Sequence, residues 1–188
     1  FKPYPICQLS ISTLRLASEI IGDLEVSQIE KIIISLPNDS YDIVAKDKLI
    51  KSQPRTPYEA KFSIYWSLAA LIVKKKLTVD SFEKQGLLNE EIHNLAKKID
   101  VKTFEHTQTA ASIPGELEVY FKDGNTKTYF EEKSSNLISN SELIINKFLQ
   151  NSSMTSDDGY VKSLLEIEET DDVGKIVGEI LNEQLKKY

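Results

Sequence analysis

The chain has 188 residues, 40% of them hydrophobic, and a formal net charge of -6. This length and hydrophobic fraction exclude a chain that is disordered throughout and favour a single domain with an appendage. The acidic balance argues against a nucleic-acid partner, because phosphate binding needs a clustered positive surface.

Cysteine content and the length of the apolar runs exclude further classes of structure. Cys7 is the only cysteine, so the chain forms neither an intramolecular disulfide nor a Cys-rich zinc site. The longest apolar stretch, residues 64–73, is about half as long as a membrane-spanning helix. No signal-type leader is visible, and the start on Phe1 inside a motif leads us to expect a fragment of a longer, cytoplasmic protein.

The first third of the chain changes from a helical to an extended pattern. Residues 9–24 place apolar side chains at helical spacing. Residues 29–36 form a β-branched run that predicts a strand, and the Pro-Asn-Asp-Ser sequence at 37–40 predicts a turn after it. Residues 41–53 have only a weak pattern, which predicts a long loop, with or without a short strand at its start.

The middle of the chain predicts a buried helix. Thr56 is a suitable helix cap, Pro57 suits the first turn, and Glu59 stands three residues after the cap. The segment that follows to Lys76 is apolar nearly all round, so this helix is expected to be central. Its last residues, Lys74–Lys76, fit the negative end of a helix dipole.

The last part predicts helices, strands and a helical tail. A short helix is expected at 78–84 and a second at 89–99, where Asn89 caps. Residues 100–105, 116–122 and 126–132 predict strands, and Asp123-Gly124 predicts a hairpin in which both turn positions tolerate positive φ. A capping box at 139–142 opens a helix through residue 148, and residues 160–188 predict acidic amphipathic helices.

These elements predict an α+β fold rather than a parallel α/β alternation. We expect an antiparallel sheet of about four strands packed with helices, formed by residues 1–150. Residues 151–188 are expected to form a helical C-terminal extension.

Lys2 and Tyr41 are candidates for binding an anionic ligand. Lys2 stands between Phe1 and Pro3, and the nearby prolines stiffen the backbone, so its ammonium is either held in place or frayed at the terminus. Tyr41 follows the predicted strand, where its phenol either hydrogen-bonds a carboxylate in a cleft or covers the edge of the core.

The remaining candidates carry weaker signals. Cys7 is typical of a small buried hydrophobe, because no neighbouring bases indicate a nucleophile. Lys61 either extends its stem over apolar surface or contributes to substrate binding. His93 and His106 are isolated, whereas a metal site needs three or four convergent ligands, so we expect no metal site.

Two stretches, read in order, resemble a known family. Residues 1–7, Phe-Lys-Pro-Tyr-Pro-Ile-Cys, look like the Lys-Pro-Tyr-Pro-x-Cys entry of the smaller, C-terminal domain of the MmgE/PrpD family. Residues 54–63 look like its most recognisable internal signature, and weaker agreement extends the likeness over residues 1–150. The chain departs from the family pattern at residues 10–11, where many members carry Thr-His, and at Trp66, where Tyr is frequent.

The resemblance implies a fold and a class of reaction. The family includes 2-methylcitrate dehydratase, cis-aconitate decarboxylase and iminodisuccinate epimerase. Its members have a large helical domain followed by a smaller α+β domain, with the active site between them and no obligatory metal or cofactor. This chain resembles the second domain, with the helical domain absent. The family's entry lysine matches Lys2, its cysteine position matches Cys7, and its pocket tyrosine matches Tyr41.

Two hypotheses follow. In the first, the chain is the C-terminal domain of a metal-independent lyase or isomerase for small di- or tricarboxylates. Lys2 then binds or polarises a substrate carboxylate. Tyr41, Cys7 and Lys61 contribute to substrate binding, and the preceding helical domain supplies the base. A homodimer is expected, without nucleic acid or membrane partners. In the second hypothesis, the chain is a non-catalytic α+β binding or dimerisation module.

Overall fold

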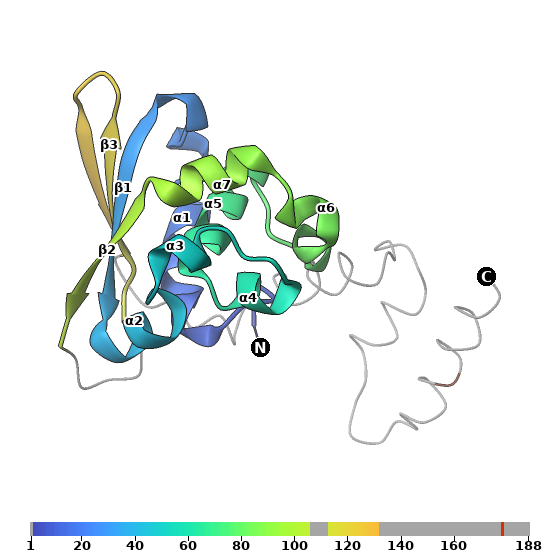
Figure 1. Ribbon diagram of the computed structural model, residues 1–188. Coiled ribbons are helices and arrows are strands. Elements are labelled where there is room, and N and C mark those ends of the chain that lie inside the picture. The colour runs from blue at the N-terminus through green and yellow to red at the C-terminus, as the bar shows by residue number, and fades with distance from the viewer. Residues whose placement is uncertain (1, 106–112, 132–177, 179–188) are drawn as a thin grey trace. The chain divides into compact units, whose positions relative to one another are not determined.

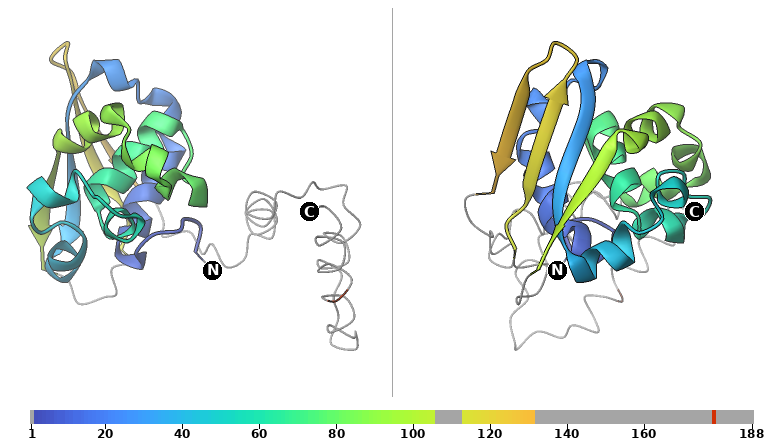
Figure 2. Two further views of the ribbon diagram at one scale, coloured as in Figure 1. Left: turned by 45° about the vertical axis from the view of Figure 1, so that its right-hand side comes forward. Right: turned by 60° about the vertical axis from the view of Figure 1, so that its left-hand side comes forward.

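The computed structural model describes residues 2–105, 113–131 and 178. The chain divides into two compact units, Phe1–Asn140 and Ser141–Tyr188, and the fold described here is that of the first. In this unit a four-stranded sheet forms one layer and the helices lie against one of its faces (Figures 1 and 2). The fold is therefore α+β, as the sequence predicts.

The sheet has the strand order β2-β1-β3-β4. The strands are β1 (Ile29–Pro37), β2 (Ile99–Phe104), β3 (Glu116–Phe121) and β4 (Thr126–Phe130). β3 pairs antiparallel with β1 and with β4, as expected, whereas β1 and β2 run parallel. The difference arises because the helices between β1 and β2 return the chain to the end of the sheet where β1 began.

The central strand β1 alternates between two environments. Ile32, Ile34 and Leu36 are buried beneath the helices, while Lys31 and Ile33 are only half-buried on the opposite face. This alternation is what a strand with one face against a core requires, because successive side chains point to opposite faces. The core is therefore a single layer between the sheet and the helices.

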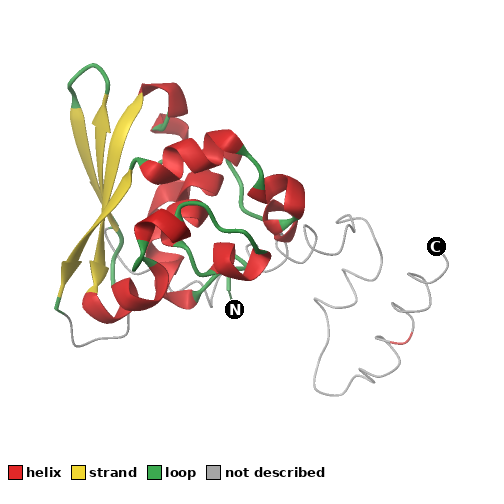
Figure 3. Ribbon diagram, viewed as in Figure 1, coloured by secondary structure: helices red, strands yellow, loops and turns green. Residues whose placement is uncertain are grey.

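Helices occupy the segments before β1 and between β1 and β2 (Figure 3). Before β1 the chain forms η1 (Gln8–Ser10), α1 (Ile11–Glu19), η2 (Ile21–Asp23) and η3 (Val26–Gln28). After β1 it forms α2 (Asn38–Val44), α3 (Lys48–Lys51), α4 (Pro57–Lys61), α5 (Ile64–Lys74), η4 (Val79–Phe82), α6 (Lys84–Leu87) and α7 (Glu90–Lys97).

The prediction of a turn and a long loop after β1 was wrong. The turn-forming residues Asn38, Asp39 and Ser40 instead make the first turn of α2, where the negative charge of Asp39 suits the positive end of the helix dipole. Asp39 accepts a hydrogen bond from the main-chain N–H of Ser40 at 2.7 Å. Only Ser40 and Val44 of this short helix are buried, so it leaves little hydrophobic periodicity in the sequence.

The predicted central helix is present but divided. Thr56 caps α4 by accepting from the Glu59 N–H at 3.2 Å, as expected, while the Glu59 carboxylate accepts from the N–H of Arg55. The helix ends at Lys61, and Ser63 caps the next helix by accepting from Trp66 N–H at 3.0 Å. Residues 64–72 of α5 are all buried, which confirms a central apolar helix.

The hairpin between β3 and β4 is confirmed, although its turn differs from the prediction. Gly124 has a φ of 89°, whereas Asp123 stays at negative φ. The Asp123 carboxylate stabilises the turn by accepting from the Asn125 N–H at 2.9 Å. The strands at 116–121 and 126–130 and the Asn89 cap of α7 also agree with the sequence.

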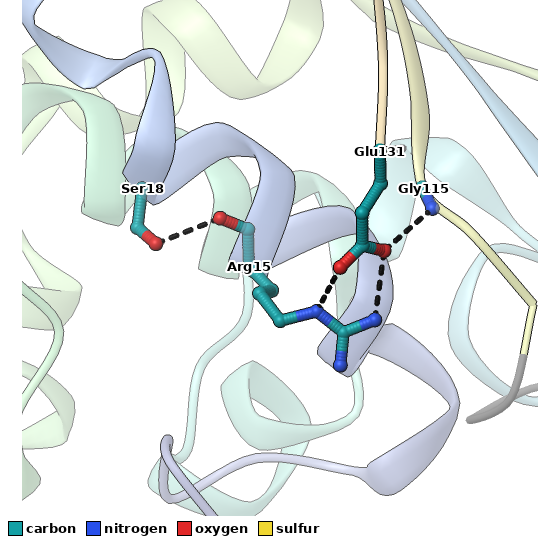
Figure 4. Close-up of polar contacts among 4 residues, drawn as sticks. All are labelled: Arg15, Ser18, Gly115 and Glu131. Carbon is teal, nitrogen blue, oxygen red and sulfur yellow. Dashed lines mark hydrogen bonds and ion pairs between the residues drawn. The ribbon is translucent and has the colours of Figure 1, made fainter. Parts of the chain in front are cut away.

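A buried ion pair joins α1 to the residue that directly follows edge strand β4 (Figure 4). The Arg15 guanidinium donates through Nε and Nη2 to the two carboxylate oxygens of Glu131, the second contact being 2.7 Å. The same carboxylate accepts from the main-chain N–H of Gly115 at 3.1 Å. Both charged groups are buried, so each needs the other as its partner in place of water.

Several predictions lie outside the described residues. These are the helix at 139–148, the boundary near residue 150, the helical extension at 151–188 and the role of His106. Among the helices of the described ranges, none combines the length and the apolar character that crossing a membrane demands.

Candidate functional site

The entry segment, residues 2–7, is anchored at one end and exposed at the other. Ile6 is buried, and its N–H donates to the Tyr4 carbonyl at 2.9 Å. Lys2 is exposed, and its ammonium donates to the Ile6 carbonyl at 3.4 Å. At this length the bond is weak, so the ammonium remains accessible to an anion.

The entry segment is hydrogen-bonded to the end of α4. The main-chain N–H of Cys7 donates to the Lys61 carbonyl at 2.9 Å. Cys7 itself is half-buried and packs against the core. The two stretches that carry the family resemblance, 1–7 and 54–63, are thus joined in space although about fifty residues of sequence separate them.

Lys61 extends over an aromatic ring. Its ammonium lies 5.6 Å from the centre of the Phe82 ring, and Phe82 in turn packs against Trp66 with ring centres 5.2 Å apart. A cation above an aromatic face is attracted by the electron-rich ring. The Lys61 ammonium therefore already has an aromatic partner, the Phe82 ring.

Tyr41 lies on α2, just beyond the end of β1, and is half-buried against the core. Its neighbour in the interior is Tyr65, whose pKa is raised well above its ordinary value by burial and further by Tyr41 and Asp100. Helix α2 also packs against η1, the turn that directly follows Cys7. Tyr41 is therefore on an element adjoining the entry segment.

Lys51, which was not among the residues predicted from the sequence, links the segments that carry the candidate residues. Its ammonium donates to the carbonyls of Ile43 at the end of α2 and of Phe62 after α4, each at 2.8 Å. Burial lowers the pKa of Lys51, an effect opposed by Asp47 and by Cys7. No sequence signal distinguishes this lysine, because it stands in the stretch with the weakest pattern.

A second charged cluster lies at the edge strand β2. Asp100 accepts from Lys31 at 2.7 Å and from Lys48 on α3, and these bonds lower the pKa of its carboxyl group. The Lys48 ammonium also lies 5.9 Å from the centre of the Tyr65 ring. Asp100 is thus kept ionised, and both of its carboxylate oxygens accept from lysines. It therefore bridges two lysines and is not available as a proton acceptor.

Three surface grooves are formed by described residues, with volumes of about 450, 470 and 300 Å³. The first lies between Asp23 and the hairpin residue Asp123, the second beside Lys76 and Gly86, and the third against Glu90 on α7.

None of these grooves is lined by Lys2, Cys7, Tyr41 or Lys61. The candidate residues instead lie on the entry segment, α2 and α4. Within the described ranges no group of three or more His, Cys, Asp and Glu side chains is arranged to hold a metal ion.

Comparison with known proteins agrees with the motifs. A search of the curated proteins found no match. A family model described as the MmgE/PrpD C-terminal domain matches residues 4–170, which is most of the chain. The match includes residues 4–7 of the entry segment, but not Lys2, and the whole of the 54–63 signature. The chain therefore belongs to the MmgE/PrpD family, of which it represents the C-terminal domain.

Proposed function

We propose that this chain is the C-terminal domain of a metal-independent lyase or isomerase that acts on small di- or tricarboxylates. The family match over residues 4–170 carries this proposal. Residues 1–150 would form the α+β domain and 151–188 a helical extension. A preceding helical domain of the same protein would complete the active site, and we further propose a cytoplasmic homodimer.

The proposed reaction begins with removal of a proton from a carbon next to a carboxylate. Such a proton is very weakly acidic, so the dianion that forms needs positioned positive charge. Lys2 would supply that charge, and its exposed side chain, whose ammonium has a long 3.4 Å bond to the Ile6 carbonyl, supports this role. The base would come from the preceding domain.

The other candidate residues would position the substrate. The Tyr41 phenol would donate to a carboxylate oxygen, and Cys7 and Lys61 would complete the binding surface. The 2.9 Å main-chain bond between Cys7 and Lys61 supports the grouping of these two residues. For its ammonium to bind substrate, Lys61 would have to leave the Phe82 ring, over which it now lies.

For dehydration and epimerisation, the fate of the carbanion formed by proton removal would determine the product. Loss of a β-hydroxyl as water after protonation gives dehydration to an alkene. Decarboxylation differs in its first step: the carboxylate leaves as carbon dioxide, and its electron pair takes up a proton. Return of a proton to the opposite face gives epimerisation.

The test is an assay of the full-length protein against a panel of small polycarboxylates, including 2-methylcitrate and cis-aconitate. Turnover of at least one of them is expected from the full-length protein, and none from the 188-residue chain alone. Turnover by the isolated chain would contradict an active site shared between domains. A full-length protein that binds but never converts the panel would favour the non-catalytic binding module.

A further inference from the structure

Helix α3 (Lys48–Lys51) turns its charged side chains inward and its apolar side chains outward, which is the reverse of the usual arrangement in a surface helix. Its two lysines are half-buried, while Leu49 is 87% exposed and Ile50 58% exposed. Surface helices of globular domains normally place apolar residues against the core and charged residues in water. The arrangement of α3 therefore needs an explanation.

The inward position of the lysines is fixed by specific partners. Lys48 pairs with Asp100 and lies over the Tyr65 ring, and Lys51 donates to the carbonyls of Ile43 and Phe62. Because these contacts come from β2, α5, the end of α2 and the residue after α4, α3 cannot turn its apolar side chains inward without breaking several of them. Leu49 and Ile50 are consequently held outward by the fold.

A third large aliphatic side chain, on the preceding helix α2, is also exposed. Ile43, at the end of α2, is 49% exposed, and its carbonyl is bonded to the Lys51 ammonium at 2.8 Å. We define the α3 surface as Ile43, Leu49 and Ile50. Single exposed apolar residues are ordinary, whereas a group of large aliphatic side chains marks an interaction surface.

We propose that the α3 surface is the docking surface for the domain that precedes this one in the same polypeptide. Membership of the family as its C-terminal domain implies such a preceding domain. The chain would join it through the entry segment, which runs directly into η1, and η1 packs against α2, the helix that carries Ile43.

The size of the surface favours a tethered partner over a second copy of the chain. A stable complex between separate proteins buries roughly 800 Å² on each partner. Three aliphatic side chains offer much less than this. A domain linked through a few residues is already present at a high effective concentration, so a small apolar contact suffices to hold it.

This inference rests on the preceding domain invoked in the proposed function but not on the reaction. Its test therefore measures contact between domains and needs no substrate. A full-length protein without activity on any polycarboxylate would overturn the proposed function and leave the docking experiment fully interpretable.

The first experiment places a photo-cross-linker on the α3 surface. Leu49→p-benzoylphenylalanine is introduced into the full-length protein, with Leu88→p-benzoylphenylalanine as the matched control, because Leu88 is also exposed, at 67%, but follows α6. After irradiation, mass spectrometry identifies the peptide joined to each position. A cross-link from position 49, but not from 88, to the preceding domain supports the proposal.

Other products of this experiment would overturn it. An adduct of twice the protein mass at position 49 would show that a second copy covers the surface. A cross-link to residues 141–188 would assign the surface to the chain's own C-terminal unit. Equal, low yields at positions 49 and 88 would show that α3 faces solvent.

The second experiment measures the contribution of the surface to docking. Leu49→Asp/Ile50→Asp in the full-length protein is expected to speed protease cleavage at the junction before the entry segment by about tenfold or more, whereas Leu88→Asp is not. In the 188-residue chain the double substitution should leave the melting temperature unchanged, because both side chains are exposed there. Equal cleavage rates for the double variant and the Leu88→Asp control would overturn the proposal.

Discussion

Arg15 and Glu131, which are 116 positions apart in the sequence, form a buried ion pair with two contacts between guanidinium and carboxylate. Arg15 lies on α1 and Glu131 directly follows β4, so the pair closes the first long helix onto the last strand of the described unit. The N–H of Gly115 also donates to the Glu131 carboxylate, which brings the start of β3 into the same contact.

Glu131→Gln is expected to destabilise the protein strongly. The substitution removes the negative charge and leaves Arg15 buried without compensation, which costs on the order of 3–5 kcal/mol. Glu118→Gln is the control, because its partner Lys102 is largely exposed and such surface pairs contribute little. Urea denaturation of both variants compares the free energies of unfolding; similar losses would show that the Arg15–Glu131 pair is not held as described.

Gly115→Ala is expected to lower stability by roughly 1–3 kcal/mol through overpacking. A Cβ at this position would lie 2.6 Å from the main-chain oxygen of Ser12 and 3.1 Å from the Cβ of Leu16, both on α1. Gly22→Ala is the matched control, because a Cβ there has no atom within 4 Å. Thermal unfolding of the two variants should therefore separate them, and equal melting temperatures would argue against close packing of α1 on β3.

Tyr65→Phe is expected to reduce the loss of stability at alkaline pH. The pKa of Tyr65 is raised in the folded protein, chiefly by burial, so the folded state retains the proton to higher pH than the unfolded state does. Its contribution is thus fully present below the ordinary tyrosine pKa of about 10 and is lost as the pH rises above it.

Unfolding free energies measured between pH 8 and 11 test this prediction. The slope above pH 10 should be shallower in Tyr65→Phe than in the wild type and unchanged in Tyr58→Phe, because Tyr58 is 70% exposed. An identical slope in all three proteins would mean that Tyr65 ionises in the folded state as easily as in the unfolded state.

Lys51→Met is expected to lower stability by about 1–3 kcal/mol, because two main-chain carbonyls lose a charged donor. The loss should be accompanied by faster amide hydrogen exchange in α2 and at the junction of α4 and α5, which the ammonium joins. Lys46→Met, which alters an exposed lysine with only a 3.5 Å contact to Asp42, should change neither quantity. Unchanged exchange in Lys51→Met would show that Lys51 does not hold these segments together.

Lys2→Ala in the full-length protein is expected to reduce kcat/KM on the active polycarboxylate by a factor on the order of 10² or more. The melting temperature should stay nearly constant, because Lys2 is exposed and its bond among the described residues is a long one to the Ile6 carbonyl of its own segment. Lys97→Ala, an exposed lysine on α7, serves as the control for a general loss of positive charge. A normal rate in Lys2→Ala would leave Lys2 as an ordinary surface lysine.

The sequence predicted those helices and turns that are determined by residues within the same segment. The continuous apolar run of α5, the caps at Thr56 and Asn89 and the glycine of the β3–β4 hairpin each fix their own segment. Helix α3 was missed for a physical reason, since its lysines point inward and its apolar residues outward. The usual relation between hydrophobic pattern and burial is reversed there.

Features that depend on distant residues could not be predicted from the sequence. The parallel pairing of β1 with β2 is decided by how the intervening helices pack, not by either strand. In the candidate site, the bond from Cys7 to Lys61 joins main-chain atoms, and such a bond does not depend on which residue types stand there. Lys51 likewise acts on main-chain carbonyls, so only the folded arrangement distinguishes it from the other lysines.

The position of β1 in the middle of the sheet has a consequence for synthesis of the protein. β1 leaves the ribosome first of the four strands, yet both of its neighbours, β2 and β3, begin only at residues 99 and 116. Until then the nascent chain carries Ile32, Ile33 and Ile34 as an unpaired β-branched segment, the kind of sequence that associates with other chains. Truncated products that stop between β1 and β2 should therefore aggregate, and the cell's holding chaperones should bind this polypeptide at residues 29–37.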